Sequence, residues 1–179
     1  MPHARHGGVR VHYEDRGPRD GEPLLLIMGL GGSGVAWFRM LPHLERDHRV
    51  LVMDNRGTGG TSDPPLARPL SLADMVRDAV AVLDDAGVER AHVHGVSMGG
   101  MIGQQLALRH RDRVRSLALA CTTAGHRFGR EQPPWRLIAG GAIGPVDPRR
   151  SWRLVEPALY ARRTIRERPH RIREDLRVR

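Results

Sequence analysis

Four short apolar runs, separated by segments with helical spacing, constrain the fold of this chain more than any other feature. The runs are Leu24–Met28, Arg49–Met53, Ala91–Val96 and Val114–Cys121. The first is a continuous apolar run, typical of a strand that is buried on both faces, and the second predicts another buried strand. The third and fourth predict two further strands. Leu72–Asp85 has apolar residues at helical spacing, and Met98–Arg109 follows the third run as a second helix. Because strands that alternate with helices form parallel sheets, we predict an α/β fold: a mostly parallel sheet with helices on both faces.

The segments around these runs predict the remaining elements. Val9–Glu14 alternates between apolar and polar residues, which predicts an edge strand. Val35–Leu44 predicts a short helix that is interrupted by Pro42. Ser71 is expected to cap the helix that follows it, and Gly87 is expected to end that helix.

The composition excludes several classes of protein. Hydrophobic residues make up 40% of the 179 residues, enough for a core, so a disordered chain is not expected. The net charge is +9, but the arginines are spread along the chain and aromatic residues are only 4%, so we predict no nucleic-acid partner. The apolar runs are much shorter than the roughly 20 residues that span a bilayer, so we predict no membrane partner. Cys121 is the one cysteine, which favours a reducing compartment, and we expect a cytoplasmic protein.

The sequence GVSMG, residues 95–99, places a serine between glycines where a predicted strand gives way to a predicted helix. The serine must leave the sheet on a turn so tight that side chains two positions away on either side would collide. Gly95 and Gly99 meet that requirement. The hydroxyl of Ser97 would then lie at a helix N-terminus, where free N–H groups favour a developing negative charge. We interpret Ser97 as a candidate nucleophile; the alternative is an ordinary strand-to-helix turn with an incidental serine.

Two further motifs accompany the serine: IMGLGG at residues 27–32 and DNRGTGGTS at residues 54–62. In order and spacing, the three motifs resemble the α/β-hydrolase fold superfamily, most closely bacterial enol-lactonases, esterases and cofactor-free haloperoxidases. The likeness covers about Val9 to Cys121 and implies that Ser97 attacks an acyl carbonyl.

The resemblance also implies an oxyanion hole formed by two backbone N–H groups, those of Leu30 and Met98. The sequence departs from the family at Met28, where histidine is usual. Because the donor in this loop is a backbone amide, the loss of that side chain does not by itself remove the hole. Read without the resemblance, the glycine loop is a flexible segment or a nucleotide cradle, but it lacks the G-x-G-x-x-G spacing and a P-loop lysine.

In this family an acid and then a histidine follow the serine along the chain. Asp147 and His170 have this order, but no buried strand precedes Asp147, and His170 lies in an arginine-rich amphipathic stretch. From about Thr122 the pattern changes to short arginine-rich helices broken by prolines, which resembles the family's helical cap. We therefore expect the N-terminal portion of a hydrolase core at residues 1–123 and a partial cap at residues 124–179. The chain is expected to stop before the strands that bear the acid and the histidine.

These observations predict a serine hydrolase that acts on a carboxylic ester or lactone and is impaired because its acid and base are missing. One alternative is an inactive remnant that serves as a binding or interaction module. Another is acyl transfer or perhydrolase chemistry on the same serine, with a different acceptor in place of water. We expect a small-molecule acyl substrate, no cofactor and no metal; the sequence predicts no oligomeric state.

Overall fold

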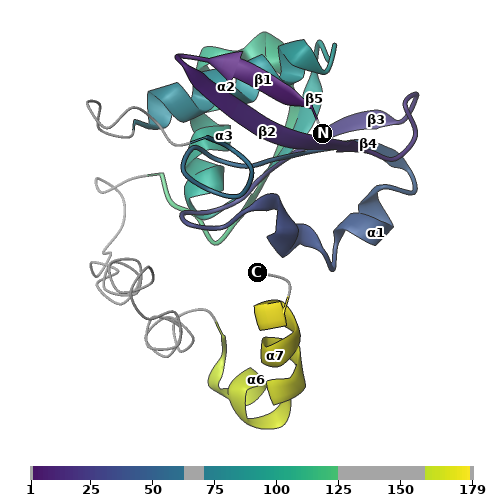
Figure 1. Ribbon diagram of the computed structural model, residues 1–179, viewed down its shortest axis with the longest axis vertical. Coiled ribbons are helices and arrows are strands. Elements are labelled where there is room, and N and C mark those ends of the chain that lie inside the picture. The colour runs from purple at the N-terminus through teal and green to yellow at the C-terminus, as the bar shows by residue number, and fades with distance from the viewer. Residues whose placement is uncertain (1, 63–70, 125–159, 178–179) are drawn as a thin grey trace. The chain divides into compact units, whose positions relative to one another are not determined.

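The computed structural model describes residues 2–62, 71–124 and 160–177. The chain divides into two compact units, residues 1–128 and 129–179. The described part of the second unit is a pair of helices, α6 (Arg162–Glu167) and α7 (Pro169–Arg177), shown in Figure 1. The predicted cap overlaps this unit, and its role as a cap stays a prediction.

The first unit contains, in its described part, a six-stranded sheet in the order β1-β2-β4-β3-β5-β6. The strands are β1 (His3–His6), β2 (Val9–Arg16), β3 (Glu22–Ile27), β4 (His48–Met53), β5 (Ala91–Val96) and β6 (Val114–Ala120). The four apolar runs form β3 to β6. β3 pairs in parallel with β4 and β5, and β5 pairs in parallel with β6. The predicted parallel sheet is therefore confirmed for these four strands.

The prediction that Val9–Glu14 is an edge strand is wrong. It forms β2, which lies between β1 and β4 and is antiparallel to both. β1, with the sequence HARH, was not predicted because it buries only one apolar side chain, that of Ala4. The hairpin turn between β1 and β2 is Gly7-Gly8, with φ values of 56° and 81°. A Gly-Gly pair at positive φ is the turn that tight hairpins favour, and this signal could have revealed the strand.

Helices cover both faces of the sheet, as predicted (Figure 1). Alternate residues of β3 point to opposite faces. Leu25 and Ile27 belong to the core beneath α2 (Leu72–Asp85) and α3 (Met98–Arg109). Leu24 and Leu26 belong to a second, smaller core that also contains Trp37 and Leu41. Those two residues come from the 3₁₀ helix η1 (Gly34–Trp37) and the short helix α1 (Leu41–Leu44).

The helix ends follow the capping residues in the sequence. The Ser71 hydroxyl accepts a hydrogen bond from the Asp74 N–H at 3.1 Å, and Gly87, at φ 64°, follows the end of α2. Both predicted caps are confirmed. The single helix predicted over Val35–Leu44 is instead η1 followed by α1. Pro42 lies in the first turn of α1, where a missing N–H breaks no helical hydrogen bond.

A buried ion pair fixes the loop that follows β4 to α2. Arg56 is 8% exposed and Asp78 is 1% exposed, and the guanidinium donates two hydrogen bonds to the carboxylate at 2.5 and 2.7 Å. The hydrogen bond to Asp78 is the main cause that raises the pKa of Arg56 above its usual value. His6 Nδ1 lies 2.8 Å from the same carboxylate, which also joins β1 to α2.

Throughout the described ranges, every helix is too short or too polar to cross a lipid bilayer.

Candidate active site

Ser97 lies at the sharp turn that the sequence predicts, directly after β5 and directly before α3. Its backbone has φ 54° and ψ −118°, a conformation that residues with a side chain rarely adopt. Three donors hold its carbonyl in place. The N–H groups of Gly100 and Met101 donate to it at 2.9 and 3.2 Å, and the Thr122 hydroxyl donates at 2.7 Å. The strained turn is therefore fixed both by the first turn of α3 and by the segment that follows β6.

The two glycines of the motif allow three backbone segments to touch. A Cβ at Gly95 would lie 2.3 Å from the carbonyl oxygen of Gly99. A Cβ at Gly99 would lie 2.1 Å from the carbonyl oxygen of Ile27, at the end of β3. Both distances are too short for any side chain. The glycines therefore let α3 start directly against the ends of β5 and β3, which is the steric requirement inferred from the sequence.

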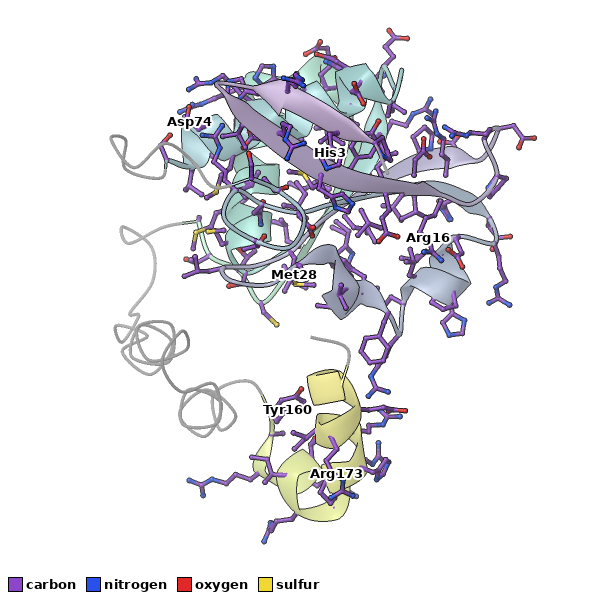
Figure 2. All side chains as sticks on the ribbon, in the orientation of Figure 1. His3, Arg16, Met28, Asp74, Tyr160 and Arg173 are labelled. Atoms are coloured by element: carbon purple, nitrogen blue, oxygen red, sulfur yellow. The ribbon has the colours of Figure 1, made fainter. Side chains whose placement is uncertain are left out.

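The loop after β3, residues 28–34, lies beside Ser97. β3 and β5 are neighbours in the sheet, with Ile27 paired to Gly95, so their carboxyl ends meet at one edge. A Cβ at Gly29 would lie 3.1 Å from Ser97 Cβ and 3.6 Å from Ser97 Oγ. Leu30 follows Gly29 directly, and its side chain is 71% exposed. Figure 2 labels Met28, the first residue of this loop.

Met98 is the first residue of α3, so its N–H belongs to the helix-terminal amides that have no partner within the helix. Leu30 and Met98 thus come from the two segments that meet at Ser97. Their joint role as an oxyanion hole stays a prediction. The resemblance implied both positions. The two glycine turns lie at one edge of the sheet because they follow the neighbouring strands β3 and β5.

The loop after β4 holds both ends of the loop at residues 28–34. The Asp54 carboxylate accepts hydrogen bonds from the Gly34 N–H at 2.6 Å and from the Gly60 N–H at 2.8 Å. The Asn55 side-chain amide donates to the Met28 carbonyl at 2.8 Å. The motif DNRGTGGTS thus ties the loop at residues 28–34 through its first two residues.

The acid and base candidates, Asp147 and His170, lie outside the described part of the first unit. Asp147 lies outside the described residues, and His170 is an exposed residue of α7 in the second unit. His92 and His94 lie within β5, before the turn. Among the side chains that the structure describes, none forms a hydrogen bond with the Ser97 hydroxyl.

His94 supplies a test of the small core beneath the turn. Its ring meets Trp37 edge to face, with 5.2 Å between ring centroids, and burial lowers its pKa below 6.5. As the pH falls below 6.5, His94 binds a proton in the unfolded chain before it does so in the folded chain. The free energy of unfolding therefore falls as the pH falls. We expect the urea midpoint of the wild type to fall more over this range than that of His94→Phe. That variant keeps an aromatic ring but does not titrate, so equal pH slopes for the two proteins would contradict the prediction.

Comparison with known proteins identifies the family. Residues 22–139, which include the serine turn and both glycine loops, match the family model for the alpha/beta hydrolase fold. The chain belongs to the α/β-hydrolase fold family. The resemblance drawn from the three motifs is thereby confirmed.

A curated relative and two solved structures agree with this family. A protein of Variovorax paradoxus (strain S110) named "Putative carbamate hydrolase RutD" is 47% identical over 110 residues, which cover 61% of this chain and 41% of the relative. Est816, an N-acyl homoserine lactone degrading enzyme, has a TM-score of 0.76 at 31% identity and covers 99% of this chain and 64% of its own. The enol-lactonase from Burkholderia xenovorans LB400 has a TM-score of 0.82 at 26% identity, with coverage of 99% and 66%. The chain thus spans about two fifths of the length of the curated relatives that it matches.

Proposed function

We propose that this chain carries the nucleophile of a serine hydrolase that acts on a carboxylic ester or lactone. The observation that carries the proposal is the geometry of Ser97. A non-glycine residue is held at φ 54° between β5 and α3, and the Gly29 loop is packed against its side chain. Strain of this kind persists where the surrounding structure over-determines it, and it is characteristic of functional sites. The Variovorax relative is named for a carbamate, whose carbonyl is open to the same attack.

In the proposed reaction the Ser97 oxygen attacks the acyl carbonyl carbon, and the hydroxyl proton passes to a base. The carbonyl oxygen becomes an oxyanion that the N–H groups of Leu30 and Met98 stabilise. The bond to the leaving alcohol then breaks, the alcohol takes up the proton, and an acyl-enzyme remains. Water attacks the acyl-enzyme in the same way and releases the carboxylic acid.

We further propose that the chain, as residues 1–179, performs this reaction slowly. A serine hydroxyl is a weak nucleophile without an adjacent base, and no described side chain of the first unit forms a hydrogen bond with the Ser97 hydroxyl. Asp147 and His170 are the acid and base candidates that the order of residues offers. The proposed substrate is a small-molecule acyl compound. Ser97 is exposed, and its hydroxyl oxygen can attack an acyl carbonyl carbon without a cofactor.

Reaction with a fluorophosphonate tests the nucleophile directly. We expect mass spectrometry to find one adduct, on the peptide that contains Ser97, after long incubation of the purified chain. The Ser97→Ala variant should form no adduct. Ser33→Ala removes a hydroxyl from the neighbouring loop at residues 28–34 and should react as the wild type does. An adduct on another residue, or none at all, would contradict the assignment and favour the binding-module alternative.

A further inference from the structure

Asn55 is buried in an unusual state. It is 1% exposed, its amide nitrogen Nδ2 donates to the Met28 carbonyl at 2.8 Å, and its Oδ1 has no hydrogen-bond partner within the described residues. A buried polar atom without a partner destabilises a protein by roughly 1–3 kcal/mol. The buried Oδ1 of Asn55 therefore lowers the stability of the fold. What the side chain contributes is the hydrogen bond that its Nδ2 donates to Met28.

The bond accepted by Met28 controls the peptide just before the proposed oxyanion donor. The Met28 carbonyl belongs to the peptide that joins Met28 to Gly29, and the next peptide carries the Leu30 N–H. On another side of this carbonyl lies the start of α3, since a Cβ at Gly99 would be 2.7 Å from the Met28 oxygen. The peptide is thus held between the Asn55 amide and the helix that begins at the serine turn.

The loop needs such a restraint because glycine dominates it. Residues 29, 31, 32 and 34 are all glycine, and glycine has the largest range of backbone conformations to lose. Gly31 has φ 70°, and a turn closes from the Gly32 N–H to the Gly29 carbonyl at 3.2 Å. Asp54 restrains the far end of the loop at Gly34. Asn55 restrains the near end, beside Ser97.

We propose that Asn55 is a positioning residue of the hydrolase. Its amide holds the Met28–Gly29 peptide so that the Leu30 N–H points to the space beside the Ser97 hydroxyl, where negative charge develops. Asn55 touches neither substrate nor the reacting atoms and acts only through the loop. The inference rests on the proposed function, since it assigns a role within the same oxyanion hole.

Backbone mobility of the loop provides the first readout. We expect the ¹⁵N order parameter of the Leu30 amide to be about 0.85 in the wild type and below about 0.6 in Asn55→Ala. Val88→Ala is the matched control. Val88 is a buried residue, 4% exposed, that precedes β5 at the opposite end of the parallel strands. Val88→Ala should lower the urea midpoint without loosening Leu30. An unchanged Leu30 order parameter in Asn55→Ala would overturn the proposal.

Asn55→Asp tests the hydrogen bond itself. The carboxylate form has the shape of asparagine but cannot donate to the Met28 carbonyl, whereas the protonated acid can. Burial raises the pKa of a carboxyl group, so lowering the pH from about 8 to about 5.5 should protonate the introduced group. The Leu30 amide should then regain its order in Asn55→Asp and not in Asn55→Ala. The same response in both variants would overturn the role of the donated bond.

The reaction of Ser97 with the fluorophosphonate provides the functional readout. Loss of one oxyanion donor lowers rates about 10²–10³-fold, so a loosened donor should lower the limiting rate of adduct formation by about 10-fold. The half-saturating probe concentration should be unchanged in Asn55→Ala. A loosened Leu30 with an unchanged limiting rate would overturn the positioning role. If wild-type Ser97 forms no adduct, the proposed nucleophile fails, whereas the order parameters still decide whether Asn55 holds the loop.

Discussion

Replacing residues 125–179 with the part of the Variovorax relative that follows its aligned segment is expected to raise ester hydrolysis by about 10²–10⁴-fold. Residues up to 124 contain the Ser97 turn and the loop beside it, but none of their described side chains forms a hydrogen bond with the Ser97 hydroxyl. In this fold the acid and the histidine follow the serine, so the added segment should supply both. The measurement is kcat/KM of purified 1–179 and of the chimera on a short-chain aryl ester.

Three variants make this comparison decisive. Ser97→Ala in the chimera should return the rate to background, which shows that the gain uses the same serine. The chimera must also unfold cooperatively in urea, because a misassembled core would be slow for another reason. If 1–179 is as fast as the chimera, and both Asp147→Ala and His170→Ala abolish its activity, then that pair is the acid and base of this chain. A folded chimera that is no faster would contradict the argument from the missing base.

The parallel part of the sheet could be predicted because its signal is local. β3 and β4 are short apolar runs, and burial on both faces selects such runs irrespective of distant residues. β6 was predicted from the same kind of pattern, although it is the edge strand and none of its residues is fully buried. β1 gave no such signal. Its residues are mostly histidine and arginine, and what fixes it is pairing with β2 and the contact of His6 with Asp78, 72 residues away. The place of β2 inside the sheet could not be predicted without β1.

The serine turn could also be predicted, since its requirement falls on residues within two positions of Ser97. Glycine at positions 95 and 99 avoids a steric clash that a side chain at either position would cause. The hydrogen bond from Asn55 to Met28 is different, because it joins residues 27 apart that meet only when β4 packs beside β3. Asn55 is the only asparagine in the sequence, but a single sequence does not show which distant backbone carbonyl its amide will meet. The acid and base could not be predicted for the same reason, because their placement depends on contacts between residues that are distant in sequence.

Gly99→Ala is expected to reduce the limiting rate of Ser97 phosphonylation by about 10²-fold. The new Cβ would lie 2.1 Å from the Ile27 carbonyl oxygen and 2.7 Å from that of Met28. Both neighbours are backbone atoms at the end of a central strand, so the start of α3 must retreat by about 1 Å. A displacement of this size near reacting groups costs about 10²-fold in rate. The rate is measured by mass spectrometry at saturating fluorophosphonate.

Gly103→Ala is the matched control, because it makes the same change one turn further along α3. There a Cβ would lie 3.0 Å from Leu117 Cδ1, the far end of a flexible side chain that can move aside. Alanine also favours a helix over glycine by about 1 kcal/mol, so this variant should keep its stability and its rate of phosphonylation. The two variants therefore separate the contact between α3 and β3 from helix propensity. If Gly99→Ala and Gly103→Ala react at equal rates, close packing of α3 against the end of β3 does not set the position of Ser97.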